Sequence, residues 1–84
     1  MGDIKVGKVS KFFSKISVAA IEITDGAIKK GDTLHIKGHT TDFQQEVYSM
    51  EIDNVPVTEA NVGDSIGIKV NERVRPNDIV YKTV

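Results

Sequence analysis

Apolar and polar residues alternate along short stretches of this chain, as they do in strands that bury one face. Within residues 64–71, Ile66, Ile68 and Val70 share one parity while small or polar residues occupy the other. No stretch keeps the i, i+3, i+4 apolar spacing of a long helix. The pattern predicts six or seven strands, at residues 3–13, 16–24, 32–38, 43–53, 64–71 and 78–83, with a short extra piece near 55–58.

Two of these stretches change phase partway. Phe43, Gln45 and Val47 fall on one parity, whereas Tyr48, Met50 and Ile52 fall on the other. A β-bulge near Val47 would reconcile the two halves, and a similar irregularity is expected around Gly7. Bulged, bent strands are what closure of a sheet into a barrel requires. We therefore expect an all-β fold, a small closed antiparallel Greek-key barrel of six to seven strands.

One turn pattern recurs before three of the strands. It places Gly31 before Asp32, Gly63 before Asp64, and Asn77 before Asp78. Glycine and asparagine tolerate positive φ, and an aspartate side chain can accept hydrogen bonds from nearby backbone N–H groups, two residues further on in an Asx turn. We interpret these as three equivalent turns with a structural role. The expected core comprises Ile21, Ile36, Val47, Met50, Ile52, Ile66, Ile68 and Val80.

Length and composition narrow the class of protein. The 84 residues, with 39% hydrophobic and 27% charged residues, predict one folded domain spanning 1–84. Cysteine is absent, which is consistent with a reducing compartment. The N-terminal residues lack the basic start and apolar run of a signal peptide, so we expect a cytoplasmic protein that does not contact a membrane.

The net charge of −1 is unevenly distributed. Residues 1–42 contain seven lysines against five acids, and residues 43–84 contain four Lys or Arg against seven acids. One interpretation is an ordinary solvated surface; the other is a weak basic stripe that contacts phosphates. The segment 11–15 combines lysines with the adjacent pair Phe12 and Phe13, which point to opposite faces of a strand. If one ring is exposed, it could stack on a base; the alternative is that both rings cap the core.

The order of several motifs gives a resemblance. The segment 27–38, then residues 47–51, then 62–70 resemble successive hairpins and strands of domain 2 in translational GTPases such as elongation factor Tu. Residues 37–43 and 49–53 are also similar to short stand-alone elongation-factor-like proteins, and to a domain at the C-terminus of collagenase-like peptidase family proteins. The resemblance implies a Greek-key barrel and, in the peptidases, an accessory role.

The resemblance also implies roles for particular positions. Glu51 falls where the elongation factor has a glutamate beside the terminal adenosine of aminoacyl-tRNA. Ser65 replaces an asparagine of that family, and Ala20-Ile21-Glu22 replaces a Thr-Gly-Arg run. These departures weaken the expectation of aminoacyl-tRNA binding of the elongation-factor kind.

Catalytic and cofactor motifs are not evident. The chain has no Gly-rich phosphate loop of the G-x-x-x-x-G-K-[ST] type, so we expect no nucleotide hydrolysis. His35 and His39 have no cysteine or adjacent acid to complete a set of metal ligands, and Glu51 and Asp53 share a strand face without an evident pocket. We expect no enzyme activity, no cofactor and no metal.

Two functions follow from these observations. The first is a non-catalytic binding module that contacts RNA (tRNA or rRNA) or the ribosome. The alternative is a protein-interaction or accessory module, the partner of a larger enzyme. The candidate RNA- or partner-binding residues are Lys8, Lys11, Phe12, Phe13, Lys15, Lys29, Lys30, Lys37 and Glu51.

Overall fold

The fold consists of strands joined by short turns. The structure is a computed structural model that describes residues 2–84, which contain ten strands and no helix. None of these residues belongs to a helix long and apolar enough to cross a membrane. The strands are β1 (Asp3–Phe13), β2 (Val18–Ile23), β3 (Ile28–Lys29), β4 (Thr33–Lys37), β5 (Asp42–Glu46), β6 (Met50–Ile52), β7 (Val55–Pro56), β8 (Glu59–Ala60), β9 (Ser65–Lys69) and β10 (Ile79–Thr83).

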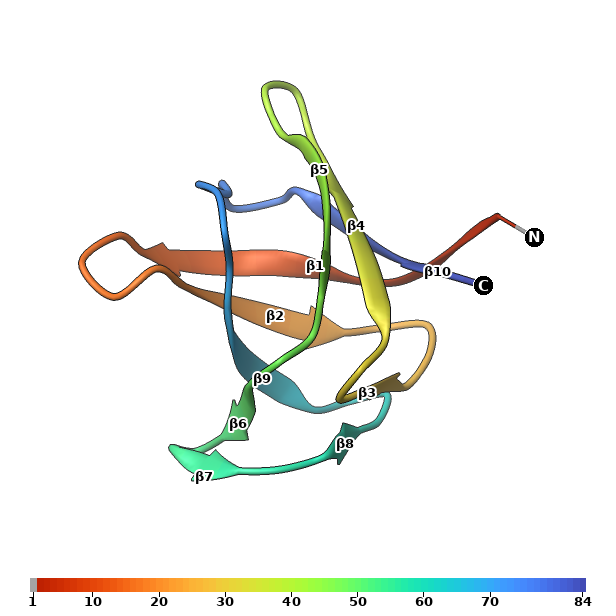
Figure 1. Cartoon of the computed structure of the whole chain (residues 1–84), viewed down its shortest axis with the longest axis vertical. Helices are drawn as coiled ribbons and strands as arrows, with labels where there is room; N and C mark the ends of the chain where they lie inside the picture. The colour runs from red at the N-terminus through yellow and green to blue at the C-terminus, as the bar shows by residue number, and fades with distance from the viewer. Residues whose placement is uncertain (1) are drawn as a thin grey trace.

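Eight strands form one antiparallel sheet in the order β5-β4-β10-β1-β2-β9-β6-β7, and β3 pairs with β8 in a second, small one. The sheet is strongly curved, so that β4 and β5 cross over β1 and β2 in Figure 1. The expected all-β, antiparallel class is confirmed. Closure into a barrel is not shown by strand pairing, because the ladder among the described residues ends at β5 on one side and β7 on the other.

The strand boundaries follow the alternation closely, with two exceptions. The expected strand 43–53 is divided into β5 and β6, with residues 47–49 outside either strand, and the short pair of β3 with β8 was not expected. The extra piece expected near 55–58 corresponds to β7, which pairs with β6. The phase change is confirmed for Val47 and Met50, which are both buried, but Tyr48, which was expected on the parity of Met50, is exposed. A break in the strand, instead of one inserted residue, lets the chain leave β4 and pair with β9.

The irregularity expected at Gly7 is present. Pairing of β1 with β10 shifts register between Lys5 and Gly7. A Cβ built on Gly7 would lie 2.2 Å from the backbone oxygen of Glu22, so only glycine allows β2 to approach this closely. A second register shift, between Val9 and Lys11, occurs in the pairing of β1 with β2. Both shifts bend the longest strand of the sheet.

The three predicted turns are equivalent in detail. Gly31, Gly63 and Asn77 have φ of 96°, 97° and 76°. The aspartate after each one accepts a hydrogen bond from the backbone N–H three residues before it, at 2.8 to 2.9 Å, instead of two residues ahead as expected. The expected direction of these aspartate hydrogen bonds along the chain was therefore wrong. The structural role is supported, because each carboxylate caps the N–H that opens its own turn.

The interior is filled by residues of the predicted parity. Seven of the eight expected core residues are buried, and Ile52 is half-buried against them. The core also contains ten residues that the sequence analysis did not predict: Val6, Val9, Ala19, Ile23, Ile28, Leu34, Phe43, Ala60, Val70 and Val74. Ser65 and Lys69 are exposed, so the phase assigned to β9 is right.

Candidate ligand pocket

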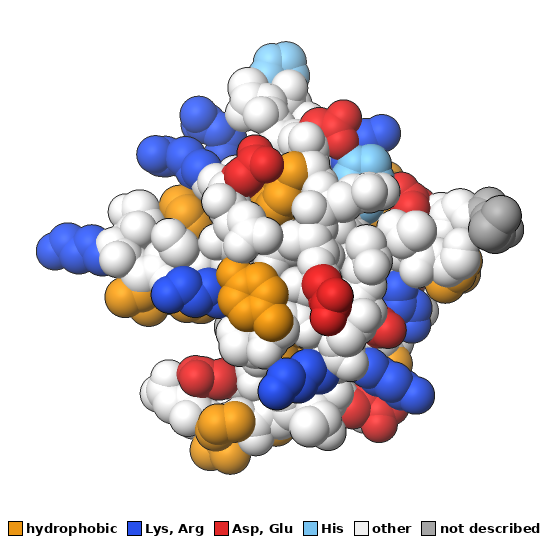
Figure 2. All heavy atoms as spheres, viewed as in Figure 1, with side chains coloured by type: hydrophobic (Ala, Val, Ile, Leu, Met, Phe, Trp, Pro, Cys, Tyr) orange, Lys and Arg blue, Asp and Glu red, His pale blue; other side chains and the backbone are white. Residues whose placement is uncertain are grey.

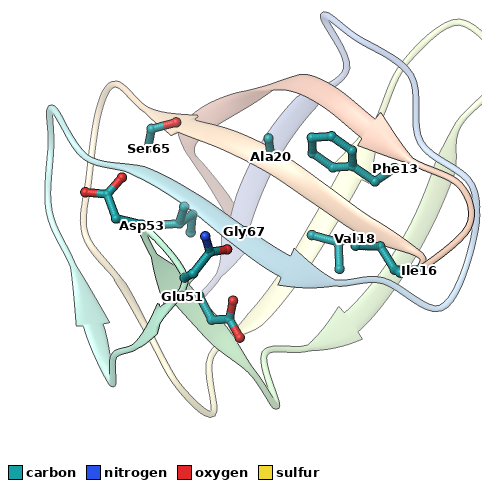
Figure 3. A pocket seen from close by; sticks show the side chains of 10 residues that line it. Phe13, Ile16, Val18, Ala20, Glu51, Asp53, Ser65 and Gly67 are labelled. Carbon is teal, nitrogen blue, oxygen red and sulfur yellow. The ribbon is translucent and has the colours of Figure 1, made fainter.

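A pocket of about 400 Å³ lies on the outer side of β2 and β9. It is bounded by the end of β1 and its turn into β2 on one side, and by β6 with its turn into β7 on the other (Figure 3). The lining residues are Phe13, Ile16, Val18, Ala20, Glu51, Asp53, Asn54, Ser65, Ile66 and Gly67.

Small residues create the hollow. Ala20 of β2 pairs with Gly67 of β9, and Gly67 pairs in turn with Glu51 of β6. A Cβ added to Gly67 would meet the Val18 side chain at 3.4 Å. Because outward side chains of neighbouring strands normally cover the sheet, an alanine beside a glycine leaves space on that face. The floor of the pocket is thus set by residue size at paired positions.

Three apolar side chains form one end of the pocket. Phe13 is 46% exposed and Ile16 is 58% exposed, although both are large hydrophobic residues. Figure 3 shows them gathered with Val18 where β1 turns into β2. The turn is held by a hydrogen bond from Ile16 N to Phe13 O (3.3 Å) and by a positive φ of 54° at Ser17. This geometry presents the two side chains outward, and exposed apolar groups that adjoin a hollow mark a binding surface.

Two carboxylates form the acidic side. Glu51 is exposed on β6, and Asp53 follows in the hairpin turn to β7. Asp53 and Asn54 both have positive φ (51° and 65°), as the two central residues of a type I′ hairpin turn require. Neither carboxylate forms an ion pair within residues 2–84. The expectation that Glu51 and Asp53 lack a pocket was wrong. The pairing of β6 with β9, which forms this side of the pocket, could not be inferred from the β6 segment alone.

A second, smaller pocket of about 220 Å³ shares Glu51. Lys30, Tyr48 and Val57 are among its lining residues. The Tyr48 hydroxyl donates a hydrogen bond to Asn71 Oδ1 at 2.8 Å, which fixes the ring over this pocket. Glu51 therefore stands between two hollows and has access to both.

The structure brings some predicted binding residues together and separates others. Phe13 and Glu51 line the larger pocket, and Lys30 and Glu51 line the smaller one. Lys11 pairs with Ala20, at the β1 end of the row of paired residues that continues through Gly67 to Glu51. Sequence alone joins none of these, because the pairing of β2 with β9 and of β9 with β6 links distant segments.

The other candidates do not form one basic stripe. Phe12 packs against the core, so of the adjacent pair it is Phe13 that is available. Lys8 lies 3.9 Å from Glu22, its partner across β1 and β2. Lys15, Lys29 and Lys37 are exposed on different turns and strands. On the face shown in Figure 2, basic and acidic side chains are interspersed.

Sequence reasoning missed Ile16, Val18, Asn54 and Gly67. One signal was readable: Asp53-Asn54 between apolar residues is a typical type I′ hairpin turn, which would have placed both side chains at a sheet edge. The others depend on which strands are neighbours.

A polar cluster elsewhere involves His35. Its ring nitrogens bond to both Asp3 Oδ2 (2.7 Å) and Asp42 Oδ1 (2.5 Å), and Thr83 donates to Asp3 at 3.0 Å. Hydrogen bonds to Asp42 and then to Asp3 raise the pKa of His35, and the bond to His35 lowers the pKa of each carboxyl. The expectation that His35 has no adjacent acid was wrong, since β1 and β5 lie on either side of the pair β10 and β4.

This cluster is not arranged as a metal site. The two carboxylates lie on opposite nitrogens of the ring, and within residues 2–84 no three His, Cys, Asp or Glu side chains could hold one metal ion. With both nitrogens facing carboxylates, the arrangement favours a protonated imidazole that ties three strands together.

Three of the five positions that the elongation-factor resemblance singled out lie in one pocket, whereas Ile21 is buried in the core and Glu22 is not among the lining residues. Ala20, Glu51 and Ser65 all line the larger pocket, although 45 residues separate the first from the last. The residues themselves differ from the elongation-factor pattern at two of the three positions, as noted above.

Comparison with known proteins identifies relatives of much greater length. No family model matches the chain. It is 43% identical over 79 residues to an uncharacterized protease of Methanocaldococcus jannaschii, covering 93% of this chain and 19% of that protein. It is 40% identical over 80 residues to a collagenase of Porphyromonas gingivalis, covering 94% and 19%. The chain therefore spans about a fifth of the length of these curated relatives.

Solved structures give a matching fold. The C-terminal domain of a putative U32 peptidase of Geobacillus thermoleovorans superposes with a TM-score of 0.86 at 16% identity, covering 93% of this chain and 90% of that one. Its selenomethionine variant gives a TM-score of 0.85. The names of these relatives refer to peptidases and collagenases and not to translation factors, which supports the second of the two resemblances. This chain is thus similar in sequence to about a fifth of each of two longer proteins, named a protease and a collagenase, and it has the fold of the C-terminal domain of a putative U32 peptidase.

Proposed function

We propose that this chain is a non-catalytic accessory module, the partner of a larger enzyme of the U32 peptidase and collagenase kind. The observation that carries the proposal is the asymmetry of coverage: more than nine-tenths of this chain matches about a fifth of each curated relative. A segment that recurs in longer enzymes and also has the fold of a separately solved domain behaves as a unit.

The composition of the pocket supports a binding role over catalysis. Ser65 is the one hydroxyl-bearing residue that lines it, and no histidine or lysine lies among the lining residues to activate that hydroxyl. The pocket instead combines an apolar end with carboxylates, which is suited to holding a group from elsewhere. The module therefore contributes recognition, and the reaction belongs to the remainder of the enzyme.

The test uses the curated relatives. The Methanocaldococcus protease or the Porphyromonas collagenase is produced without the segment that matches this chain, and binding of the 84-residue protein is measured by calorimetry. The excised segment of the same relative serves as positive control. We expect the chain to bind this remainder and to cleave no peptide or gelatin by itself. Cleavage by the chain alone, or binding by the excised segment only, would contradict the proposal.

RNA binding is the second candidate, and one observation favours it: exposed Lys11 and Lys15 flank exposed Phe13. With three or four phosphates engaged, the slope of log affinity against log salt would be about −2 to −3. Titration of tRNA and single-stranded RNA at two salt concentrations, with the Lys11→Glu, Lys15→Glu variant, separates the two functions. Binding sensitive to both salt and the double substitution would place RNA first.

We also infer that the sheet closes into a barrel through side chains. Gln45 of β5 donates from Nε2 to Lys69 O (2.8 Å) and accepts from Asn71 N at Oε1 (2.7 Å), at the end of β9. In addition, β5 and β6 lie on one continuous segment yet stand near opposite ends of the strand order. The amide thus joins β5 to β9 where no ladder does.

A further inference from the structure

We propose that the larger pocket is the docking site for an arginine side chain of the partner polypeptide. The inference rests on the proposed accessory function, which requires a partner, and it names the chemistry by which this module holds that partner. Three features of the pocket lead to it: its charge, its apolar end, and the geometry of its acceptors.

The charge of the lining is the first feature. Two carboxylates, Glu51 and Asp53, line the pocket, and no lysine or arginine is among the ten lining residues. Neither carboxylate has an ion-pair partner in the part of the chain that the structure describes. A phosphate placed here would be repelled by both, whereas a cation would be attracted by both.

The apolar end excludes a bare metal ion or a small ammonium as the best occupant. Phe13, Ile16 and Val18 lie at one end of the pocket. From there the floor, formed by the paired Ala20 and Gly67, continues toward the acidic side (Figure 3). An occupant that contacts both the apolar end and the acidic side must therefore carry an apolar stem as well as a charge. Arginine and lysine both have such a stem, which packs on apolar surface while the head reaches polar groups.

The acceptors favour arginine over lysine. Glu51, Asp53, the Asn54 side-chain carbonyl and the Ser65 hydroxyl offer several acceptor atoms on different sides of the pocket. A guanidinium presents five N–H donors in a plane and is more weakly hydrated than an ammonium, so it loses less on leaving water. It can also donate to two carboxylates at once. The pocket is thus matched to a planar, multivalent donor.

The experiment uses the 84-residue protein and a small probe. We expect N-acetyl-arginine amide to produce saturable amide shifts at Ala20, Gly67 and Asn54 in ¹H–¹⁵N spectra, with a Kd on the order of 1–10 mM for so small a ligand. N-acetyl-lysine amide should bind several-fold more weakly, and adenosine monophosphate should leave these amides unmoved. A Glu51→Gln, Asp53→Asn variant should weaken arginine binding about tenfold.

Matched variants keep the test interpretable. Both substitutions are isosteric, and asparagine tolerates the positive φ of position 53, so the variant is expected to fold. Glu46→Gln, an exposed acid of β5 outside the pocket, should leave binding unchanged. Equal affinity for the lysine probe, stronger binding of adenosine monophosphate, or arginine binding that survives the double substitution would each overturn the assignment.

The failure of this inference is distinguishable from failure of the proposed function. If the chain binds the remainder of the enzyme and the Glu51→Gln, Asp53→Asn variant binds it equally well, the module is accessory but this pocket is not its contact. If neither protein binds the remainder while the arginine probe still binds, the pocket chemistry stands and the accessory role does not.

Discussion

Gly31 donates its backbone N–H to the carbonyl oxygen of Val47 at 2.8 Å, and Val47 donates back to Asp32 O at 2.8 Å. The other two turns make the same reciprocal pair: Gly63 and Asp64 with Ile23, and Asn77 and Asp78 with Val9. Each turn thus clamps a buried residue of a distant segment. Three short motifs that recur along the sequence fix three separate crossings of the fold.

The turn geometry predicts a specific order of substitutions at Gly31. A Cβ would meet no atom within 4 Å, so only the φ of 96° opposes a side chain there. Gly31→Val should destabilise by about 1–3 kcal/mol, whereas Gly31→Asn should cost distinctly less, because asparagine tolerates such φ and occupies the equivalent position 77. Urea unfolding of both variants checks this. Equal losses would mean that steric crowding, and not φ, restricts the position.

The hydrogen bonds of Gln45 predict how β5 is joined to the end of β9. The Gln45 side chain is 6% exposed and holds the end of β9 through two hydrogen bonds. Gln45→Leu keeps similar bulk but leaves Lys69 O and Asn71 N without these partners, so we expect a loss of about 1–3 kcal/mol in the free energy of unfolding. Gln44→Leu, at an exposed neighbouring position, is the control. An unaltered unfolding midpoint for Gln45→Leu would show that β5 and the end of β9 are held together by packing alone.

Truncation of the apolar face of β9 is predicted to destabilise the fold strongly. Ile66 and Ile68 are buried and pair with Ile21 and Ala19 of β2. Replacing either by alanine should cost about 2–5 kcal/mol, a large share of the stability of an 84-residue domain. Circular dichroism on heating gives the readout, with exposed Lys69→Ala as control. Loss of the fold in the lysine variant but not in the isoleucine variants would reverse the assigned strand phase.

The cluster of His35 with Asp3 and Asp42 predicts a pH dependence of stability. Since the pKa of His35 is raised above 6.5, its contribution is full below that pH and is lost as pH rises through the raised value. Since both carboxyl pKa values are lowered below 3.8, their contribution is full above it and is lost on further acidification. The cluster therefore stabilises most between about pH 4 and 6.5.

Thermal melting from pH 3 to 9 tests this window. The difference in Tm between the native protein and a His35→Asn variant should be largest between about pH 4 and 6.5 and should shrink on both sides. His39→Asn, in the turn between β4 and β5, should parallel the native protein throughout. A difference that stays constant with pH would show that His35 acts through packing and not through its charge.

The sequence by itself determined the features that local chemistry controls. Alternation gave the strands and the buried face of β9, and the Gly-Asp and Asn-Asp pairs marked the three turns, because positive φ and side-chain capping depend on neighbouring residues only. The change of phase between Val47 and Met50 was likewise readable, since burial parity is a property of the chain itself.

Tertiary structure alone decided where these elements meet. No local pattern joins Ala20, Gly67 and Glu51, and only the pairing of β2 with β9 and of β9 with β6 brings them together in one pocket. In the same way His35 became an ion-pair centre because β1 and β5 stand on either side of it. Strand neighbours are set by long-range packing of the whole core, which no local pattern encodes.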